Sequence, residues 1–329
     1  MLGWFDEAQL PQFASRTPPR HRASHDGRRR GGGVGYGRLV ASALVVVSLL
    51  VPGTVAEAAF PGGNGDIAFG RATKGQVDIW AFEGGRAPTR RLTDTPTRIE
   101  SMPDWNSAGT RVAYVRCADG KTGNCDIFAM DADGSNRVRL TATPGVQETW
   151  PAWSPTGAQI AYTSNALDSF QDIWVMDANG SNQTRLTTTA AFDAFPEWSP
   201  NGQSIAFTSD RVAADDIWVM DEIGSNPVRL TSGPRVDERP DWAPDGTRIV
   251  FSRNGNIWVM DDNGQNEAQL THSRHDDFAP VFAPNGRRIA FNRLGNDERI
   301  GVWVMRDDGS DREQKTFGRI DFFPDWQPL

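Results

Sequence analysis

The chain has 329 residues, with 34 lysines and arginines against 42 aspartates and glutamates, and the resulting formal charge of −8 argues against a nucleic-acid-binding protein. Apolar residues make up 38% of the chain, and 33 glycines, 21 prolines and 12 tryptophans interrupt it too often for long helices. The composition predicts an all-β protein. Residues 1–58 are net basic and residues 59–329 net acidic, so a basic leader precedes an acidic domain.

The leader is typical of an export signal. Residues 1–38, rich in Arg, Gly, Ser and Pro, are expected to be a basic disordered segment. Residues 39–58 hold the uncharged run Leu39 to Pro52 and then Ala56, Glu57 and Ala58, a small-x-small pattern that a signal peptidase accepts. The run is shorter than the roughly 20 residues of a membrane span. We expect export to the periplasm or the extracellular space, with no stable membrane span after cleavage; an uncleaved anchor is the alternative.

The two cysteines, Cys117 and Cys125, flank a Gly-containing insert between two expected strands. In an exported protein such a pair is typical of a disulfide rather than of a metal or catalytic site.

Residues 59–329 repeat a unit of 40 to 48 residues, the period of β-propeller blades. Each complete unit opens with Pro-x-Trp or Pro-x-Phe and continues through a Gly turn, an I-A-F-like run, a loop, an I-W-V-M-D-like run, a second Gly turn and usually R-L-T. This pattern predicts four antiparallel strands per unit, with the aromatic residues packed between neighbouring sheets. The opening prolines are Pro103, Pro151, Pro196, Pro240, Pro280 and Pro324.

The two ends of the repeat array complement each other. The first unit, from Gly65 to Thr93, lacks an opening strand, whereas the last segment, from Phe323 to Pro328, is an opening strand with nothing after it. We therefore expect a single domain, a six-bladed propeller closed by a C-terminal strand that completes the first blade.

Repeats of the form P-x-W-S-P-[DN]-G-x-x-I-A-[FY], followed by I-W-V-M-D-x-x-G and R-L-T, resemble the WD-like repeats of TolB-type propellers. The resemblance covers about four fifths of the chain and recurs in every unit. It implies an envelope protein that binds other proteins without catalysis. TolB itself carries an α/β domain before its propeller, and this sequence shows no counterpart of it, so partner contacts made through that domain are not carried over.

Two kinds of connection are expected at opposite faces of the ring. The first-to-second and third-to-fourth turns are short and uniform, whereas the second-to-third loops and the links into each opening strand differ from unit to unit. We place the working surface at the variable connections. The residue before each opening Pro is apolar, aromatic or Arg, the composition of a protein-binding hot spot, although packing against adjacent loops would explain it equally well. The candidate binding-face residues are Met102, Trp150, Phe195, Arg239 and Phe323.

A carboxylate stands three residues before every opening Pro. Recurrence in all units favours a structural task, such as accepting backbone N–H bonds at the mouth of the channel. The alternative is an acidic ring that holds a cation, the one cofactor that the sequence allows for. These channel-mouth carboxylates are Glu100, Glu148, Asp193, Asp237, Asp277 and Asp321.

His272 and His275 are the only histidines after the leader, and they are weak metal candidates because loop spacing does not ensure a common face. No G-x-S-x-G, H-E-x-x-H or Walker motif occurs in the sequence. The sequence therefore favours a monomeric, non-enzymatic propeller that binds an envelope or extracellular protein or peptide. The alternatives are a metal-dependent lactonase or lyase with the two histidines and the channel-mouth carboxylates as ligands, and a carbohydrate-binding protein that stacks sugars on Trp150, Phe195 and Phe323.

Overall fold

The computed structural model describes residues 63–73, 75–82, 89–118, 123–167, 170–212, 214–317 and 320–329. The leader and the signal segment expected at residues 1–58 lie outside these residues. Within them the protein is all-β and has no α-helix. It also has no helix long and apolar enough to span a membrane in this part of the chain.

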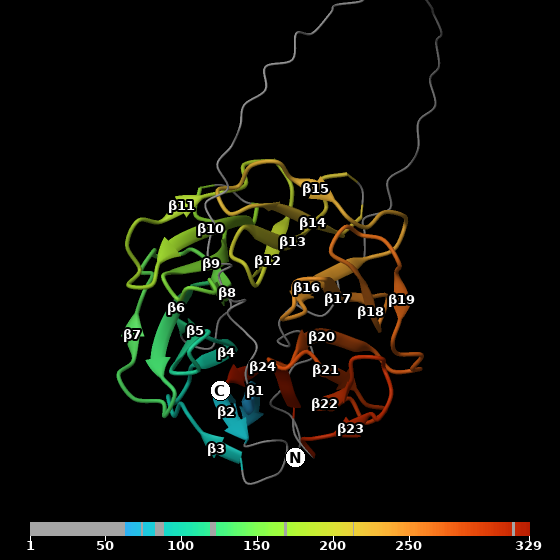
Figure 1. Cartoon of the computed structure of the whole chain (residues 1–329). Coiled ribbons are helices and arrows are strands. Elements are labelled where there is room, and N and C mark those ends of the chain that lie inside the picture. The colour runs from blue at the N-terminus through green and yellow to red at the C-terminus, as the bar shows by residue number, and fades with distance from the viewer. Residues whose placement is uncertain are drawn as a thin grey trace, which may run out of the picture.

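The strands form antiparallel sheets that follow one another around a common centre (Figure 1). Each repeat contributes an inner strand next to the centre, two middle strands and a short outer strand. The inner strands are β4 (Ile99–Trp105), β8 (Glu148–Trp153), β12 (Asp193–Trp198), β16 (Asp237–Trp242), β20 (Asp277–Phe282) and β24 (Ile320–Pro328).

The second and third strands of each repeat pair along their whole length, except that the first three residues of the first repeat's second strand do not pair with its third strand. The second strands are β1 (Asn64–Thr73), β5 (Arg111–Cys117), β9 (Gln159–Ser164), β13 (Ser204–Ser209), β17 (Arg248–Arg253) and β21 (Arg288–Leu294). The third strands are β2 (Gln76–Phe82), β6 (Cys125–Asp131), β10 (Asp172–Asp177), β14 (Asp216–Asp221), β18 (Asn256–Asp261) and β22 (Ile300–Arg306).

The outer strands are only two or three residues long. They are β3 (Thr89–Arg91), β7 (Val138–Arg139), β11 (Thr184–Arg185), β15 (Val228–Arg229), β19 (Ala268–Gln269) and β23 (Glu313–Gln314). The R-L-T motif explains how each is fixed, because its threonine hydroxyl accepts a backbone N–H of the third strand. Thr231 accepts the Ile217 N–H in this way at 2.9 Å, and both residues are buried.

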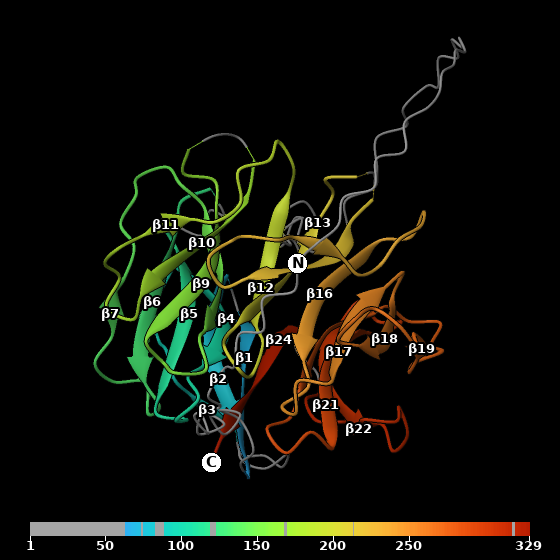
Figure 2. The ribbon, with the colours of Figure 1, turned by 45° about the horizontal axis from the view of Figure 1, so that its top comes forward.

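Four of the sheets are four-stranded, and a fifth sheet contains eight strands. In the eight-stranded sheet, β24, β1, β2 and β3 are joined to β4 through β7 by one parallel residue pair, Val77 with Ile99. The C-terminal strand β24 pairs antiparallel with β1, as the complementary ends of the repeat array predicted. Figure 2 shows β24 beside β1 and β4.

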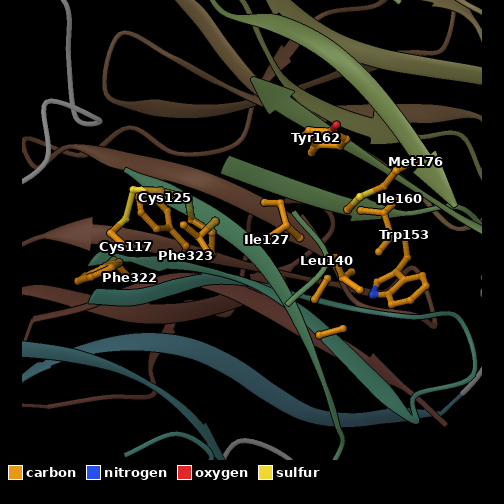
Figure 3. Close-up of a cluster of buried hydrophobic side chains, with 14 residues drawn as sticks. Cys117, Cys125, Ile127, Leu140, Trp153, Ile160, Tyr162, Met176, Phe322 and Phe323 are labelled. Atoms are coloured by element: carbon orange, nitrogen blue, oxygen red, sulfur yellow. A yellow bond between two sulfur atoms is a disulfide. The ribbon is translucent and has the colours of Figure 1, made fainter. Parts of the chain in front are cut away.

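Aromatic and aliphatic side chains fill the spaces between sheets. Figure 3 shows one such cluster, in which Ile127 and Leu140 of one repeat meet Trp153 and Met176 of the next. In the second to sixth repeats, the glycine of the third-to-fourth turn brings neighbouring repeats into backbone contact. A Cβ placed on Gly134, which has φ of +88°, would lie 2.3 Å from the carbonyl oxygen of Leu92. Glycine is therefore required there for the sheets to approach.

Candidate functional site: the central channel

Every inner strand is irregular at its Pro. Register shifts occur around this position in the six inner strands, because Pro has no N–H to donate to the ladder. The residue before the Pro has a positive φ of +49° to +57°, a left-handed conformation that non-glycine residues rarely adopt. These six residues are Met102, Trp150, Phe195, Arg239, Ala279 and Phe323.

Side chains of the preceding repeat hold this strained backbone. Phe195 donates its N–H to the hydroxyl of Thr163 at 3.2 Å, and Arg239 donates its N–H to Thr208 at 3.1 Å. Across the seam between the last repeat and β24, the Phe323 N–H is bound by the Asn292 side-chain oxygen at 2.7 Å. Ala279 is held in the same way by the hydroxyl of Ser252, so four of the six bulges are fixed by a side chain of the preceding repeat, which compensates for the strain of about 1–3 kcal/mol.

The strained residues project their side chains toward one another across the channel. Trp150 makes edge contacts with both Phe195 and Phe323, each with ring centroids 4.7 Å apart. The guanidinium of Arg239 lies 4.8 Å from the Trp150 centroid and 5.0 Å from that of Phe323. We call Met102, Trp150, Phe195, Arg239 and Phe323 the plug, because side chains from five inner strands meet there.

Arg239 brings a buried cation into this apolar cluster. Its side chain is 6% exposed, and burial lowers its pKa to about 10, while the charge of Glu238 acts in the opposite direction. The guanidinium therefore stays protonated at neutral pH. The aromatic faces around it supply cation–π attraction, which is worth more in a desolvated site than on a surface.

The plug corrects two expectations from the sequence. The structure brings all five candidate binding-face residues together, but Met102, Phe195, Arg239 and Phe323 are each less than 10% exposed and contact one another rather than solvent. They therefore offer little area to a protein partner. The same packing occupies the faces of Trp150, Phe195 and Phe323, which consequently do not form open platforms for stacking sugars.

The six carboxylates three residues before each Pro are buried, and their partners are arginines and hydroxyl groups rather than the expected backbone N–H groups. Five of the six form ion pairs within their own repeat. The pairs are Arg116–Glu100, Arg211–Asp193, Arg253–Asp237, Arg293–Asp277 and Arg71–Asp321, at 2.6 to 3.0 Å. The charge of these residues is matched inside the protein, so they do not form an open acidic ring for a cation.

Glu148 is the exception in this set. Burial raises its pKa, and the hydroxyls of Thr141 and Thr143 act in the opposite direction by hydrogen bonding to it. Ser164 stands opposite Glu148 in the strand register, at the position that Arg116 occupies opposite Glu100.

The acidic residues that do line the channel stand directly after the Pro. Asp104, Glu197, Asp241 and Asp325 line both of two cavities, of about 110 and 80 Å³, at the centre of the ring. The larger cavity is also lined by the plug, and the smaller one by tryptophans and by prolines of the first-to-second turns. The sequence analysis missed these carboxylates. They could have been found at the middle position of the Pro-x-Trp motif, which is acidic in four of the six repeats.

Three of these carboxylates connect neighbouring inner strands. Asp325 accepts the Trp105 N–H at 2.6 Å, and Asp104 accepts the Trp153 N–H at 2.7 Å. Asp241 accepts the Phe282 N–H at 2.6 Å. Burial and the repulsion among neighbouring carboxylates raise the pKa values of Asp104 and Glu197, and burial raises that of Asp325 to about 7.

The remaining candidates lie away from the channel. Cys117 and Cys125 form the expected disulfide, and both are buried. His272 is exposed, whereas His275 borders a separate pocket beside Arg293 and Arg299. Among the described residues, no three His, Cys, Asp or Glu side chains are grouped so that they could hold a metal ion.

Large apolar side chains are exposed on two neighbouring variable loops. Leu167, Phe170 and Val212 are 66%, 42% and 56% exposed. The link before β12 joins these loops, since Asp193 donates its N–H to the Gln171 carbonyl and Asp210 donates its N–H to the Phe192 carbonyl. The three side chains therefore belong to one connected set of loops, which we call the apolar loop surface.

Comparison with known proteins places the fold in context. The family model described as the TolB beta propeller domain matches residues 144–329. TolB from Acinetobacter baumannii superposes with a TM-score of 0.70 at 21% identity, covering 80% of this chain and 67% of that one. A putative TolB from Agrobacterium tumefaciens gives 0.62 at 20% identity, covering 81% and 92%.

More distant structures share the architecture alone. The hydrazine synthase of Kuenenia stuttgartiensis gives a TM-score of 0.68 at 14% identity, covering 85% of this chain and 50% of that one. Among curated proteins, none matches this chain.

Proposed function

The chain belongs to the TolB beta propeller domain family, and from that premise we propose that it is an exported, non-enzymatic module that binds a protein or peptide of the cell envelope or its surroundings. Fold alone does not fix the function of a propeller, so the proposal depends on where this chain exposes binding surface. The observation that carries it is the apolar loop surface, formed by Leu167, Phe170 and Val212.

We infer that the ring has six blades. The eight-stranded sheet joins its halves through the single pair of Val77 and Ile99, so we count it as two blades of four strands. Strand β24 then completes the first blade by pairing with β1. In a ring closed in this way β1 is paired on both sides, by β2 and by β24, so the first blade lacks no strand, which favours a monomer.

The apolar loop surface has the chemistry of a protein-binding site. Large apolar side chains exposed together on joined loops mark interaction sites more often than singly exposed ones do. The loops belong to the variable connections, where repeats are free to differ while the sheets below hold them in place. We therefore place the partner on the loops around Phe192 rather than on the plug.

Two further parts of the proposal rest on indirect support. Export is supported by the Cys117–Cys125 disulfide, because such bonds persist in oxidising compartments. The non-enzymatic role is supported by the family, and we propose no cofactor. A metal-dependent enzyme would need ligands beyond His272 and His275; His272 is exposed, and the pocket beside Arg293 is lined by His275 without it.

A binding experiment with matched variants tests the proposal. The full chain is expressed with its export segment, cross-linked in intact cells and purified, beside the variant Leu167→Ser, Phe170→Ser, Val212→Ser. The control is Val138→Ser, Ile223→Ser, Val228→Ser, which removes exposed apolar side chains outside the apolar loop surface. Each captured partner is then purified and its affinity for the three proteins is measured directly.

We expect the loop variant to lose at least tenfold in affinity for the partner and the control to bind as the wild type does. Equal binding by all three would overturn the assignment of the surface. Turnover of a lactone or an ester by the purified protein would overturn the non-enzymatic role.

A further inference from the structure

Four repeats share an ion pair on a buried aspartate that the last two repeats lack. The residue just before the I-W-V-M-D-like run is Asp78, Asp126, Asp172 or Asp216, and each is paired with the arginine of the R-L-T motif in the same repeat. In the repeat of β20 to β23, Gly301 replaces the aspartate and Gln314 replaces the arginine. The loss of both partners leaves no orphaned charge, but it removes one side chain, at Gly301, and replaces a guanidinium with the shorter amide of Gln314.

Gln314 retains only part of the arginine's role. Its side-chain nitrogen donates to the Thr316 carbonyl at 2.8 Å, as Arg139 donates to the Thr141 carbonyl in the second repeat. A Cβ on Gly301 would lie 3.1 Å from the same nitrogen of Gln314. Glycine therefore lets Gln314 lie against the strand here, and the space next to these two residues is the pocket that both of them line.

Arg293 faces this space with a donor that its counterparts use. Arg71, Arg253 and Arg293 occupy the same position in their repeats, and each binds its own inner-strand aspartate through Nε and Nη2. Nη1 of Arg71 donates to the Thr89 hydroxyl, and Nη1 of Arg253 donates to the Glu267 carboxylate.

The residue in the sixth repeat that corresponds to Thr89 and Glu267 is Arg312, and it donates instead to the Leu270 carbonyl of the preceding repeat. Nη1 of Arg293 consequently has no partner among the described residues. In the fifth repeat the equivalent nitrogen, Nη1 of Arg253, is bound by the carboxylate of Glu267, so a carboxylate is the group that would bind Nη1 of Arg293.

The open space is a pocket of about 260 Å³, separate from the central channel. Arg293 and Trp303 form its inner wall, with the guanidinium 4.5 Å from the indole centroid. Arg299 and His275 stand at its rim, and Asn296 and Gln314 add amide groups. The nearby carboxylate of Asp277 is already bound by Arg293. Asp297 lies 3.5 Å from Arg299 at the rim, but both side chains are exposed, so a ligand's carboxylate can compete with Asp297 for Arg299.

We propose that this pocket binds a small polar molecule through a carboxylate, which accepts hydrogen bonds from Nη1 of Arg293 and from Arg299. The ligand's carboxylate takes the place that Glu267 occupies beside Arg253. Charge-assisted bonds from arginine to a carboxylate are strong and directional, and the amide groups of Asn296 and Gln314 suit hydroxyl groups elsewhere on the ligand. This binding is separate from the partner proposed for the apolar loop surface.

Titration followed by NMR tests the site in the full chain. The probes are sodium glucuronate and sodium acetate, with glucose as the uncharged match for glucuronate and sodium chloride as the match for ionic strength. The readout is the indole N–H resonance of Trp303, identified from its disappearance in Trp303→Phe. The key variant is Gly301→Asp, which restores the aspartate of the other repeats and places a carboxylate in the pocket beside Arg293.

We expect both carboxylates to shift this resonance saturably, glucose and chloride to leave it unchanged, and Gly301→Asp to weaken glucuronate binding at least tenfold. The matched control is Asn256→Asp in the fifth repeat, where Glu267 already satisfies Arg253; it should bind as the wild type does. Should Gly301→Asp not fold, the exposed Arg299→Gln makes the same test with an expected loss of at least threefold. No saturable shift with either carboxylate, or undiminished binding by the folded pocket variant, would overturn the proposal.

Discussion

The guanidinium carbon of Arg239 lies 4.8 Å from the centroid of the Trp150 ring, although Arg239 belongs to β16 and Trp150 to β8. The sheet that contains β12 lies between these two strands in the chain, so the contact spans the channel rather than a sheet. It shows that residues at one repeated position meet at the centre of the ring. Their packing makes the plug a part of the core.

Phe323→Ala should therefore destabilise the protein as a core substitution does. Phe323 is 9% exposed and contacts Trp150, Phe322 and Arg239. We expect a loss of about 3–4 kcal/mol in the free energy of unfolding, measured by urea denaturation. Phe317→Ala is the control, since Phe317 is 72% exposed and should change stability by less than about 0.5 kcal/mol. Equal effects of the two would show that the plug does not pack as described.

Asp325→Asn should stabilise the protein increasingly as the pH rises. Burial raises the pKa of Asp325 to about 7 in the folded state, whereas the pKa of an aspartate in the unfolded chain is about 3.9. Between these values the folded state holds a proton that the unfolded state has lost, so this group's contribution to stability falls as the pH rises. An amide oxygen still accepts the Trp105 N–H and carries no charge.

The gain in the free energy of unfolding from Asp325→Asn should be near zero at pH 4, where Asp325 is neutral in the folded state. At pH 8 it should be on the order of 2 kcal/mol. Each unit of pKa difference between the folded and unfolded states is worth ~1.4 kcal/mol, of which water in the channel screens a part. Denaturation curves at several pH values measure it. Asp262→Asn, at an exposed turn residue, should show no such trend. A gain independent of pH would contradict a raised pKa at Asp325.

Gly134→Ala should disrupt the contact between the first two repeats. A Cβ at this position would lie 2.3 Å from the Leu92 carbonyl oxygen, in addition to the strain of φ at +88°. Gly145→Ala separates the two effects, because Gly145 has φ of +76° with nothing within 4 Å of its Cβ position. We expect about 1 kcal/mol of destabilisation at Gly145 and at least about 3 kcal/mol at Gly134. Similar values for both would mean that backbone strain alone accounts for the glycine.

Removal of the disulfide by Cys117→Ala, Cys125→Ala should lower the free energy of unfolding by about 2–3 kcal/mol, because the bond closes a short loop in the unfolded chain. Reductant should destabilise the wild type by a similar amount and leave the double variant unchanged. A response of the double variant to reductant would show that the effect has another source.

The sequence by itself determined the repeat period, the all-β propeller, the family and the pairing of β24 with β1, because these follow from local patterns that recur along the chain. Tertiary structure alone decided which inner-strand side chains face the channel. Glu100 and Asp104 are four residues apart and would share a face in a regular strand.

The register shows Glu100 opposite Arg116 and Asp104 opposite Ala113, three residues apart on β5, so the two carboxylates lie on opposite faces. The extra residue of the bulge causes this switch. In four of the other inner strands the same bulge is held by a side chain of the preceding repeat. The positions of the plug and of the buried acids therefore depend on contacts between repeats, which no pattern within one repeat records.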